Sequence, residues 1–388
     1  MPDGRKNPVS LLPDGSVLKG VLLPRYDEQR RLVGDLKAEK MTLIDPEHVQ
    51  GEDVLIRFYN PDRSLRGKAA LKNALFDQVK SLLSAQEDVV ITTDRLVARG
   101  TGLVYAFRDG EGFLSGPAST WVSAPPTTTS MNANPLSKAA LLALCLAPSP
   151  LIALPPAFVT EEEIAAIRAE ADSVRPIAAK RNAETQANLA ADVVKGEKAS
   201  EAATAFINTA GIEITATSEP EKPAEAKPLE TNPGPDDTLI TCDGGMYFDA
   251  DEGVLVYLKN VTVKDPRFHL KGADELKVFF DQKPEDPEKK TAGPGNFGDV
   301  KKLIARGTIL LKQKSVDGKD PVEASGGLLT YDIPSGEIII SERFPWVRQG
   351  SFYARAKEPN LTLRLLNNGS FSTQGNWEMG GKLKLDGQ

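Results

Sequence analysis

The sequence is poor in the residue types that most often carry chemistry. It has 2 histidines and 2 cysteines in 388 residues. Neither His48 nor His269 stands among Cys or carboxylate residues at metal-ligand spacing, which argues against a metal site. No sequence motif pairs either histidine with a Ser or Cys nucleophile and an orienting carboxylate. We therefore predict a protein that is not an enzyme, with no catalytic residue, no metal and no cofactor.

Aromatic residues and net positive charge are also scarce. Because aromatics make up only 6% of the chain, its core must be mostly aliphatic and the usual lining of a sugar cleft is missing. A pair of catalytic carboxylates of the glycosidase type is not excluded by the sequence, since Asp and Glu are plentiful. The net charge of −7 argues against a nucleic-acid partner. Most of this acidity lies in residues 126–235, as expected for a solvated connector.

One long apolar run extends from Leu136 to Leu154 and contains Cys145. About 19 residues are enough to span a bilayer, but Pro148 and Pro150 would break a soluble helix. Two interpretations stay open, a membrane or interface segment and a helical hairpin packed on a β domain. A disulfide between Cys145 and Cys242 also stays open, and no secretory signal is visible at the start of the chain.

Residues 10–125 alternate short apolar segments with turn signals and are interpreted as a β domain. The alternation at Val54–Phe58 predicts a strand, and Val89–Thr93 predicts another. In contrast, the apolar residues of Ala69–Leu83 recur at helical spacing, so we expect a short helix or a loop-like excursion there.

Residues 126–235 are interpreted as a connector. After the apolar run, Thr160 and Glu163 have the spacing of a capping box. A helical pattern follows over about 160–206, with an interruption expected at Pro176. Residues 218–235 are rich in Pro, Glu and Lys, which predicts a disordered or extended linker.

Residues 236–388 return to apolar segments separated by turn signals. Candidate strands include Gly253–Val263, Leu303–Lys312 and Glu337–Ser341. No helical pattern separates them, so an all-β, largely antiparallel architecture is expected. The string Gly293–Gly298 matches G-x-G-x-x-G, but no strand leads into it, and we interpret it as a hairpin loop.

The two strand-rich regions match each other at an offset of 226 residues, with 7 identities over 18 positions. In both copies a strand ends at a Tyr, a Gly-centred turn follows, and a second strand begins. The identical pairs are Ala98 and Ala324, Gly100 and Gly326, Leu103 and Leu329, Tyr105 and Tyr331, Gly110 and Gly336, Glu111 and Glu337, and Ser115 and Ser341. A repeated strand-and-turn unit is typical of β-solenoids and stacked curved sheets.

The C-terminal copy resembles the OstA-like domain of lipopolysaccharide-export bridge proteins. Three strings carry the resemblance: Ala324–Asp332, a small-residue strand that closes on Tyr-Asp, the apolar strand Gly336–Ile340, and Phe344–Gly350, which contains Pro-x-Val-x-x-Gly. Upstream, Met246–Asp249 and Tyr257–Val263 fit the opening of that domain. Residues 36–122 resemble the related LptC-like domain more loosely.

The resemblance implies an all-β fold of two open β-jellyroll (β-taco) domains, residues 10–125 and 236–388, joined by a partly helical, partly disordered connector. In this family an apolar trough shields the acyl chains of lipopolysaccharide, and sheet edges pair end to end with neighbouring subunits. The trough candidates are Leu103, Tyr105, Phe107, Val254, Val256, Leu258, Phe268, Leu270, Leu276, Val278, Phe280, Leu329, Tyr331 and Ile333. In a closed sandwich the same residues would form an ordinary core.

The leading hypothesis is a non-catalytic protein of the periplasm or cell envelope that binds or relays lipopolysaccharide-like amphiphiles. Its partners would be the lipid and other bridge-type envelope proteins, with membrane contact through residues 136–154. The alternative is a structural or scaffolding protein whose β edges mediate assembly without lipid transport. Lys264, Lys271 and Lys277 either meet lipid phosphates or form a solvated strand face.

Overall fold

A computed structural model describes residues 13–26, 30–60, 62–123, 161–214, 234, 236–250, 252–281, 297–315 and 320–381, with helix side chains from residue 183 onward. Over these ranges the chain forms 22 strands and one helix, which confirms the predicted all-β class. Contacts divide the chain into two units, residues 1–124 with 192–388, and residues 125–191. All strands belong to the first unit. The apolar run 136–154 lies outside the described residues, as does the linker 218–235 apart from Gly234.

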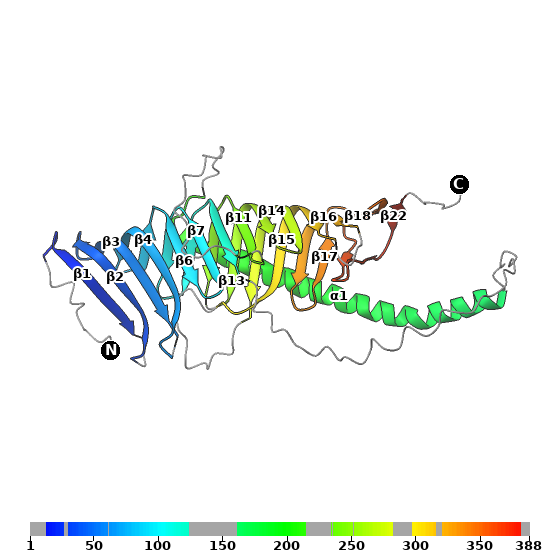
Figure 1. Ribbon diagram of the computed structural model, residues 1–388, viewed down its shortest axis with the longest axis horizontal. Coiled ribbons are helices and arrows are strands. Elements are labelled where there is room, and N and C mark those ends of the chain that lie inside the picture. Colours follow the sequence, from blue (N-terminus) through cyan, green and yellow to red (C-terminus); the bar gives the residue numbers. More distant parts are fainter. Residues whose placement is uncertain are drawn as a thin grey trace, which may run out of the picture. The chain divides into compact units, whose positions relative to one another are not determined.

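All the strands join in one antiparallel sheet that folds into two arms (Figure 1). Long strands run through both arms and bend on the way. They are β1(Val17–Tyr26), β2(Leu32–Leu43), β3(His48–Tyr59), β4(Leu65–Asp77), β13(Val254–Lys264), β14(Phe268–Phe280), β15(Val300–Gln313) and β16(Val322–Asp332). Between β4 and β13 the arms separate into short strands, because β4 pairs with different strands through its two ends.

The short strands complete the two arms. The first arm continues from β4 through β5(Leu82–Ala85), β8(Leu103–Ala106), β9(Glu111–Leu114) and β12(Met246–Asp249) to β13. The second arm continues through β6(Val89–Thr93), β7(Leu96–Gly100), β10(Ala118–Val122) and β11(Thr238–Cys242) to β13. Beyond β16 the first arm ends with β17(Glu337–Ser341), β20(Leu363–Leu365) and β21(Phe371–Thr373). The second arm ends with β18(Trp346–Gln349), β19(Phe352–Ala356) and β22(Trp377–Gly380).

Strand pairing joins the two β regions directly. In the first arm, β9 pairs with β12 along its whole length, from Glu111 to Leu114. In the second arm, β10 pairs with β11 from Ala118 to Val122. The division into domains at residues 10–125 and 236–388 stays a prediction, but the two regions share one continuous sheet.

Each long strand bends where its regular pairing is interrupted. In β13 the register shifts between Leu258 and Val261, and Lys259 and Asn260 have left-handed φ values of 59° and 47°. In β14 the bend falls at Gly272, whose φ is 76°. A Cβ atom there would lie 2.2 Å from the carbonyl oxygen of Thr308, so only glycine fits. These bulges bend the strands, and the two arms face each other as a result.

The helix expected over Ala69–Leu83 is absent, because β4 occupies most of that segment, and the prediction was wrong. The inward residues of β4 are Ala69, Leu71 and Ala74. Their alternation slips by one residue at Lys72, where the strand passes the bend opposite Asp53. The helical spacing did not mark one buried face, because Leu75 and Val79 of that apolar set are 37% and 59% exposed.

The predicted connector helix is confirmed as α1(Glu161–Ala210). It begins directly after Thr160, where the capping-box pattern places its start. It also continues through Pro176, where an interruption was expected. Residues 192–210 of this helix belong to the same unit as the sheet.

The two matching sequence segments adopt the same turn. Gly110 donates a backbone hydrogen bond of 3.1 Å to Ala106, and Gly336 donates one of 2.9 Å to Asp332. Both glycines have a φ of 70°. The turns therefore match in hydrogen bonding and in the left-handed conformation that glycine favours.

Candidate functional site

One continuous apolar cluster fills the space between the two arms. It extends along the sheet from Ala38 of β2 to Leu365 of β20. Its central side chains are fully buried, with Leu276, Val278 and Leu311 each 0% exposed. The trough expected from the resemblance is therefore filled by the protein's own side chains.

Most of the predicted trough residues lie in this interior. The cluster contains Leu103, Tyr105, Phe268, Leu270, Leu276, Val278, Phe280, Leu329 and Tyr331, while Phe107 and Ile333 pack against it half-buried. Residues from both β regions thus contribute to one interior. Their role in lipid binding stays a prediction.

Val254, Val256 and Leu258 need a correction, because they point away from the interior. They share one face of β13, but the inner face carries Leu255 and Tyr257. This part of β13 is buried on both faces. Alternation alone shows which residues share a face, and it cannot distinguish the inner face when both are apolar.

The last part of α1 covers the outer face of the first arm. The ring of Phe206 lies 5.7 Å from that of Tyr247, and Lys195 Nζ lies 4.5 Å from the ring centroid of Phe279. Ser200 donates a hydrogen bond of 2.6 Å to Glu275. This covering explains why Val256 is 0% exposed although it points outward.

Lys277 also lies beneath this helix. Both roles expected for it, a contact with lipid phosphates and a place on a solvated strand face, are therefore wrong. Its side chain is 5% exposed and pairs with Glu275 at 2.7 Å. Gly196 of α1 passes close to it, because a Cβ at that glycine would lie 3.4 Å from Lys277 Cδ. A second ion pair joins Lys302 to Asp192 of the helix.

We expect Phe206→Ala to loosen residues 192–210 from the sheet. Truncating a buried Phe typically costs about 3–5 kcal/mol, and Phe206 is 9% exposed. Amide hydrogen exchange in residues 192–210 should accelerate, while exchange in β14 changes little. Val194→Ala is the matched control, because Val194 is 51% exposed on the same helix. Equal protection of the helix in both variants would show that Phe206 does not anchor it.

Two tyrosines of the first arm contact the second arm across the interior. Tyr331 packs edge-on against Phe268, with ring centroids 5.4 Å apart. Tyr105, at the matching position of the N-terminal copy, contacts Phe58 at 6.0 Å. The two tyrosines are 3% and 2% exposed. Each half of the interior is thus bridged by an aromatic pair.

Arg267 adds a polar contact at the free end of the second arm. Its guanidinium lies 5.5 Å from the ring centroid of Tyr331 and donates hydrogen bonds of 2.8 and 3.1 Å to Asp265. Burial by itself would raise the pKa of Asp265, but hydrogen bonds from Arg267 and Thr238 outweigh it and hold that pKa below its ordinary value. The carboxylate therefore stays charged and fixes Arg267 beside the tyrosine.

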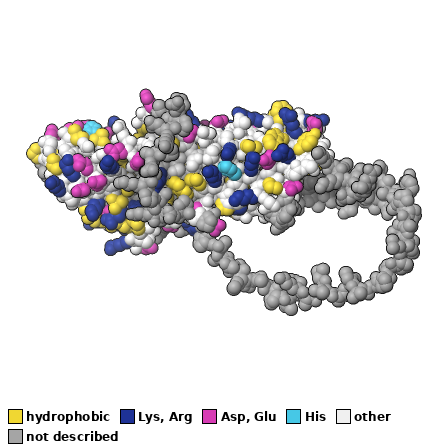
Figure 2. Space-filling model, turned by 45° about the horizontal axis from the view of Figure 1, so that its top comes forward, with side chains coloured by type: hydrophobic (Ala, Val, Ile, Leu, Met, Phe, Trp, Pro, Cys, Tyr) yellow, Lys and Arg dark blue, Asp and Glu magenta, His cyan; other side chains and the backbone are white. Residues whose placement is uncertain are grey.

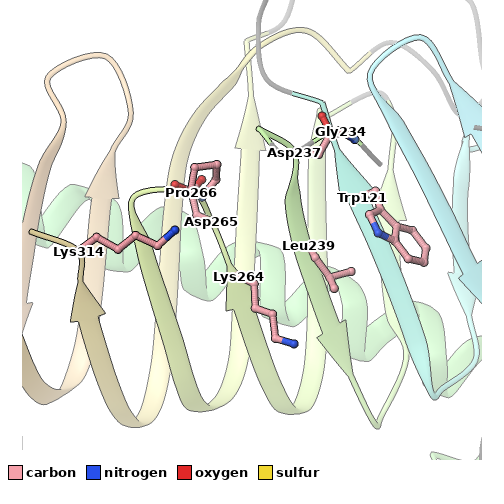
Figure 3. A pocket seen from close by; sticks show the side chains of 8 residues that line it. All are labelled: Trp121, Gly234, Asp237, Leu239, Lys264, Asp265, Pro266 and Lys314. Atoms are coloured by element: carbon pink, nitrogen blue, oxygen red, sulfur yellow. The ribbon is translucent and has the colours of Figure 1, made fainter. Parts of the chain in front are cut away.

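The outer surface carries charged side chains of both signs, with smaller groups of hydrophobic ones (Figure 2). A surface pocket lies where the two β regions meet. Its lining residues are Trp121, Gly234, Asp237, Leu239, Lys264, Asp265, Pro266 and Lys314. In Figure 3, Trp121, Leu239 and Lys264 project to the same side from β10, β11 and β13. Asp237 accepts a hydrogen bond of 2.7 Å from the backbone of Gly234, and Asp265 is held by Arg267.

Within the described ranges, no three His, Cys, Asp or Glu residues are grouped so that they could hold a metal ion. No helix in those ranges is both long enough and apolar enough to cross a membrane. Cys242 has a free, buried thiol, and burial raises its pKa to about 11. Cys145 lies outside the described residues.

No protein-family model matches this chain, and no curated protein does. Among the solved structures that match is LptH of Pseudomonas aeruginosa, described as the LptA-homologous periplasmic component of the lipopolysaccharide transport device. The two sequences are 15% identical, the TM-score is 0.29, and the match covers 38% of this chain and 95% of LptH.

Proposed function

We propose that this chain is a non-catalytic protein of the periplasm or cell envelope that binds or relays lipopolysaccharide-like amphiphiles between its two arms. The continuous apolar interior from Ala38 to Leu365 carries the proposal. It follows the sheet strand by strand, and acyl chains are linear apolar groups that such a path suits. The OstA-like strings of residues 324–350 favour the same function.

Binding requires the arms to separate, since the interior is filled. Side-chain contacts such as Phe268–Tyr331 and Phe58–Tyr105 bridge the arms away from the bends. An acyl chain that replaces these contacts restores apolar packing, so separation costs less with the lipid than without it. The bends at positions such as Gly272 are where the arms would hinge.

A photoreactive side chain placed in the interior should capture lipopolysaccharide. We expect adducts from position 280 or position 331, whose residues Phe280 and Tyr331 face inward. Position 256 is the matched control, because Val256 is equally buried but lies on the outer face of the first arm. Adducts are measured by mass shift after irradiation of the full chain with lipopolysaccharide. Absence of adducts at both interior positions, or equal capture at position 256, would contradict the proposal.

The alternative is assembly through sheet edges without lipid transport. Among the described strands β1 pairs only with β2, and its Val17, Leu22 and Tyr26 are exposed. At the other end of the sheet, within the part of the chain that the structure describes, β21 and β22 each pair on one side only. Such edges accept further strands, from a second copy or from a bridge-type partner. Oligomers that grow with protein concentration and ignore added lipid would favour this alternative.

A further inference from the structure

The outer face of the second arm stays exposed among the described residues, in contrast to the first arm with its helix. One outward row on this face runs across the strands through Trp121, Lys264, His269, Lys312, Arg348 and Tyr353. A parallel row contains Arg99, Lys271, Trp346 and Arg355. We name these two rows the bare face. It crosses the junction between the two β regions without a break.

The bare face is basic, although the chain carries a net charge of −7. Its rows hold six Lys and Arg side chains, against Glu323 of β16 and Glu378 of β22 as the acidic ones. Glu323 is shared by Lys312 at 2.8 Å and Arg348 at 3.1 Å. Among the described residues Lys264, Lys271 and Arg355 form no ion pair. All three side chains are exposed.

The pKa of His269 reflects the positive charge that surrounds it on this face. Burial lowers the pKa of its imidazole, and the charges of Lys271, Lys264 and Lys312 lower it further. Lysines of three neighbouring strands thus act on one point.

Aromatic side chains lie among these basic residues. Trp121 and Trp346 are half-exposed, and Tyr353 is 44% exposed. Arg99 lies over the Trp121 ring at 5.9 Å. Trp and Tyr among Lys and Arg are typical of surfaces that meet lipid headgroups, where amphipathic rings sit at the interface and cations meet phosphates. Protein interfaces are instead depleted of Lys.

We propose that the bare face docks on an anionic bilayer surface, with Lys264, Lys271 and Arg355 against lipid phosphates and Trp121 and Trp346 at the headgroup level. This docking is independent of lipid capture in the interior. It uses a different face of the sheet and requires no separation of the arms.

Vesicle binding by charge-reversed variants tests the docking. The full chain should sediment with vesicles of equal parts phosphatidylglycerol and phosphatidylcholine, but not with phosphatidylcholine alone. Each basic residue near an anionic surface contributes about fivefold in affinity, so Lys264→Glu, Lys271→Glu and Arg355→Glu combined should weaken binding by about 100-fold or more. The control combines Lys19→Glu, Lys72→Glu and Lys198→Glu, exposed residues outside the bare face with the same total charge change. It should retain most of the binding.

Tryptophan quenching by brominated phosphatidylglycerol locates the contact. A variant that keeps only Trp121, and one that keeps only Trp346, should be quenched on vesicles. A variant that keeps only Trp377 should not, because Trp377 packs against the interior cluster. Failure to bind anionic vesicles, equal loss in both triple variants, or equal quenching of all three tryptophans would overturn the proposal. The vesicles contain no lipopolysaccharide, so none of these outcomes bears on lipid capture between the arms.

Discussion

If the chain is cut between its two β regions, the two fragments are expected to stay associated as one complex. The cut falls in the connector, while the regions stay joined by β9–β12 and β10–β11 pairing. The interior is also continuous across this junction, where Tyr105 stacks on Phe248 with ring centroids 6.0 Å apart. Buried strand pairs and a shared core hold fragments together as they hold an intact domain.

A protease site inserted after Ser130 provides the test. After cleavage, both fragments should elute together at the mass of the intact chain and unfold in one transition. Gly112→Val in the cleaved protein should release them, because a Cβ at Gly112 would lie 2.2 Å from the Phe248 ring. Gly234→Ala is the control, since its Cβ would make only ordinary contacts, the nearest at 3.7 Å. Fragments that separate without any substitution would show that the junction pairs too weakly to join the regions.

The local elements were predictable because short-range signals determine them. The strands β6 and β17 have the bounds that alternation and turn residues predicted, and α1 begins where the capping box indicated. The error at β4 has a physical cause. The spacing that indicated a helix combined inward Leu71 with exposed Leu75 of the same strand and exposed Val79 of the following turn, so it did not mark one face.

The arrangement in space was less predictable, because it depends on which apolar face meets which partner. Val256 and Tyr257 are both fully buried on opposite faces of β13, one beneath α1 and one in the interior. A usable signal lay in the connector itself, where Ala199, Ala203 and Phe206 follow helical spacing and are all buried. That apolar stripe indicates that part of the connector covers a sheet face. Nothing local could reveal the pairing of β9 with β12, since their residues are far apart in the chain.

Tyr105 and Tyr331 bridge the two arms, so they affect both the stability of the fold and the proposed binding between the arms. We expect Tyr331→Ala to lower the stability of the protein strongly. Tyr331 is 3% exposed and contacts Phe268 and Arg267 of the other arm. Truncating a buried aromatic side chain typically lowers the free energy of unfolding by about 3–5 kcal/mol. The loss should appear as a lower midpoint of urea unfolding. Tyr353→Ala is the control, because Tyr353 is 44% exposed, and its cost should stay below about 0.5 kcal/mol.

Tyr331→Ala should also leave an apolar cavity between the arms that an apolar probe can occupy. Fluorescence of N-phenylnaphthylamine should therefore rise in this variant and stay at the level of the unsubstituted chain in Tyr353→Ala. Tyr331→Phe retains the ring and should bind no additional probe, which separates the loss of cross-arm packing from the loss of the hydroxyl. A destabilised variant without added probe binding would mean that the arms close over the vacancy. Since lipid capture requires the space between the arms to accept an apolar guest, that result would count against the proposed function as well.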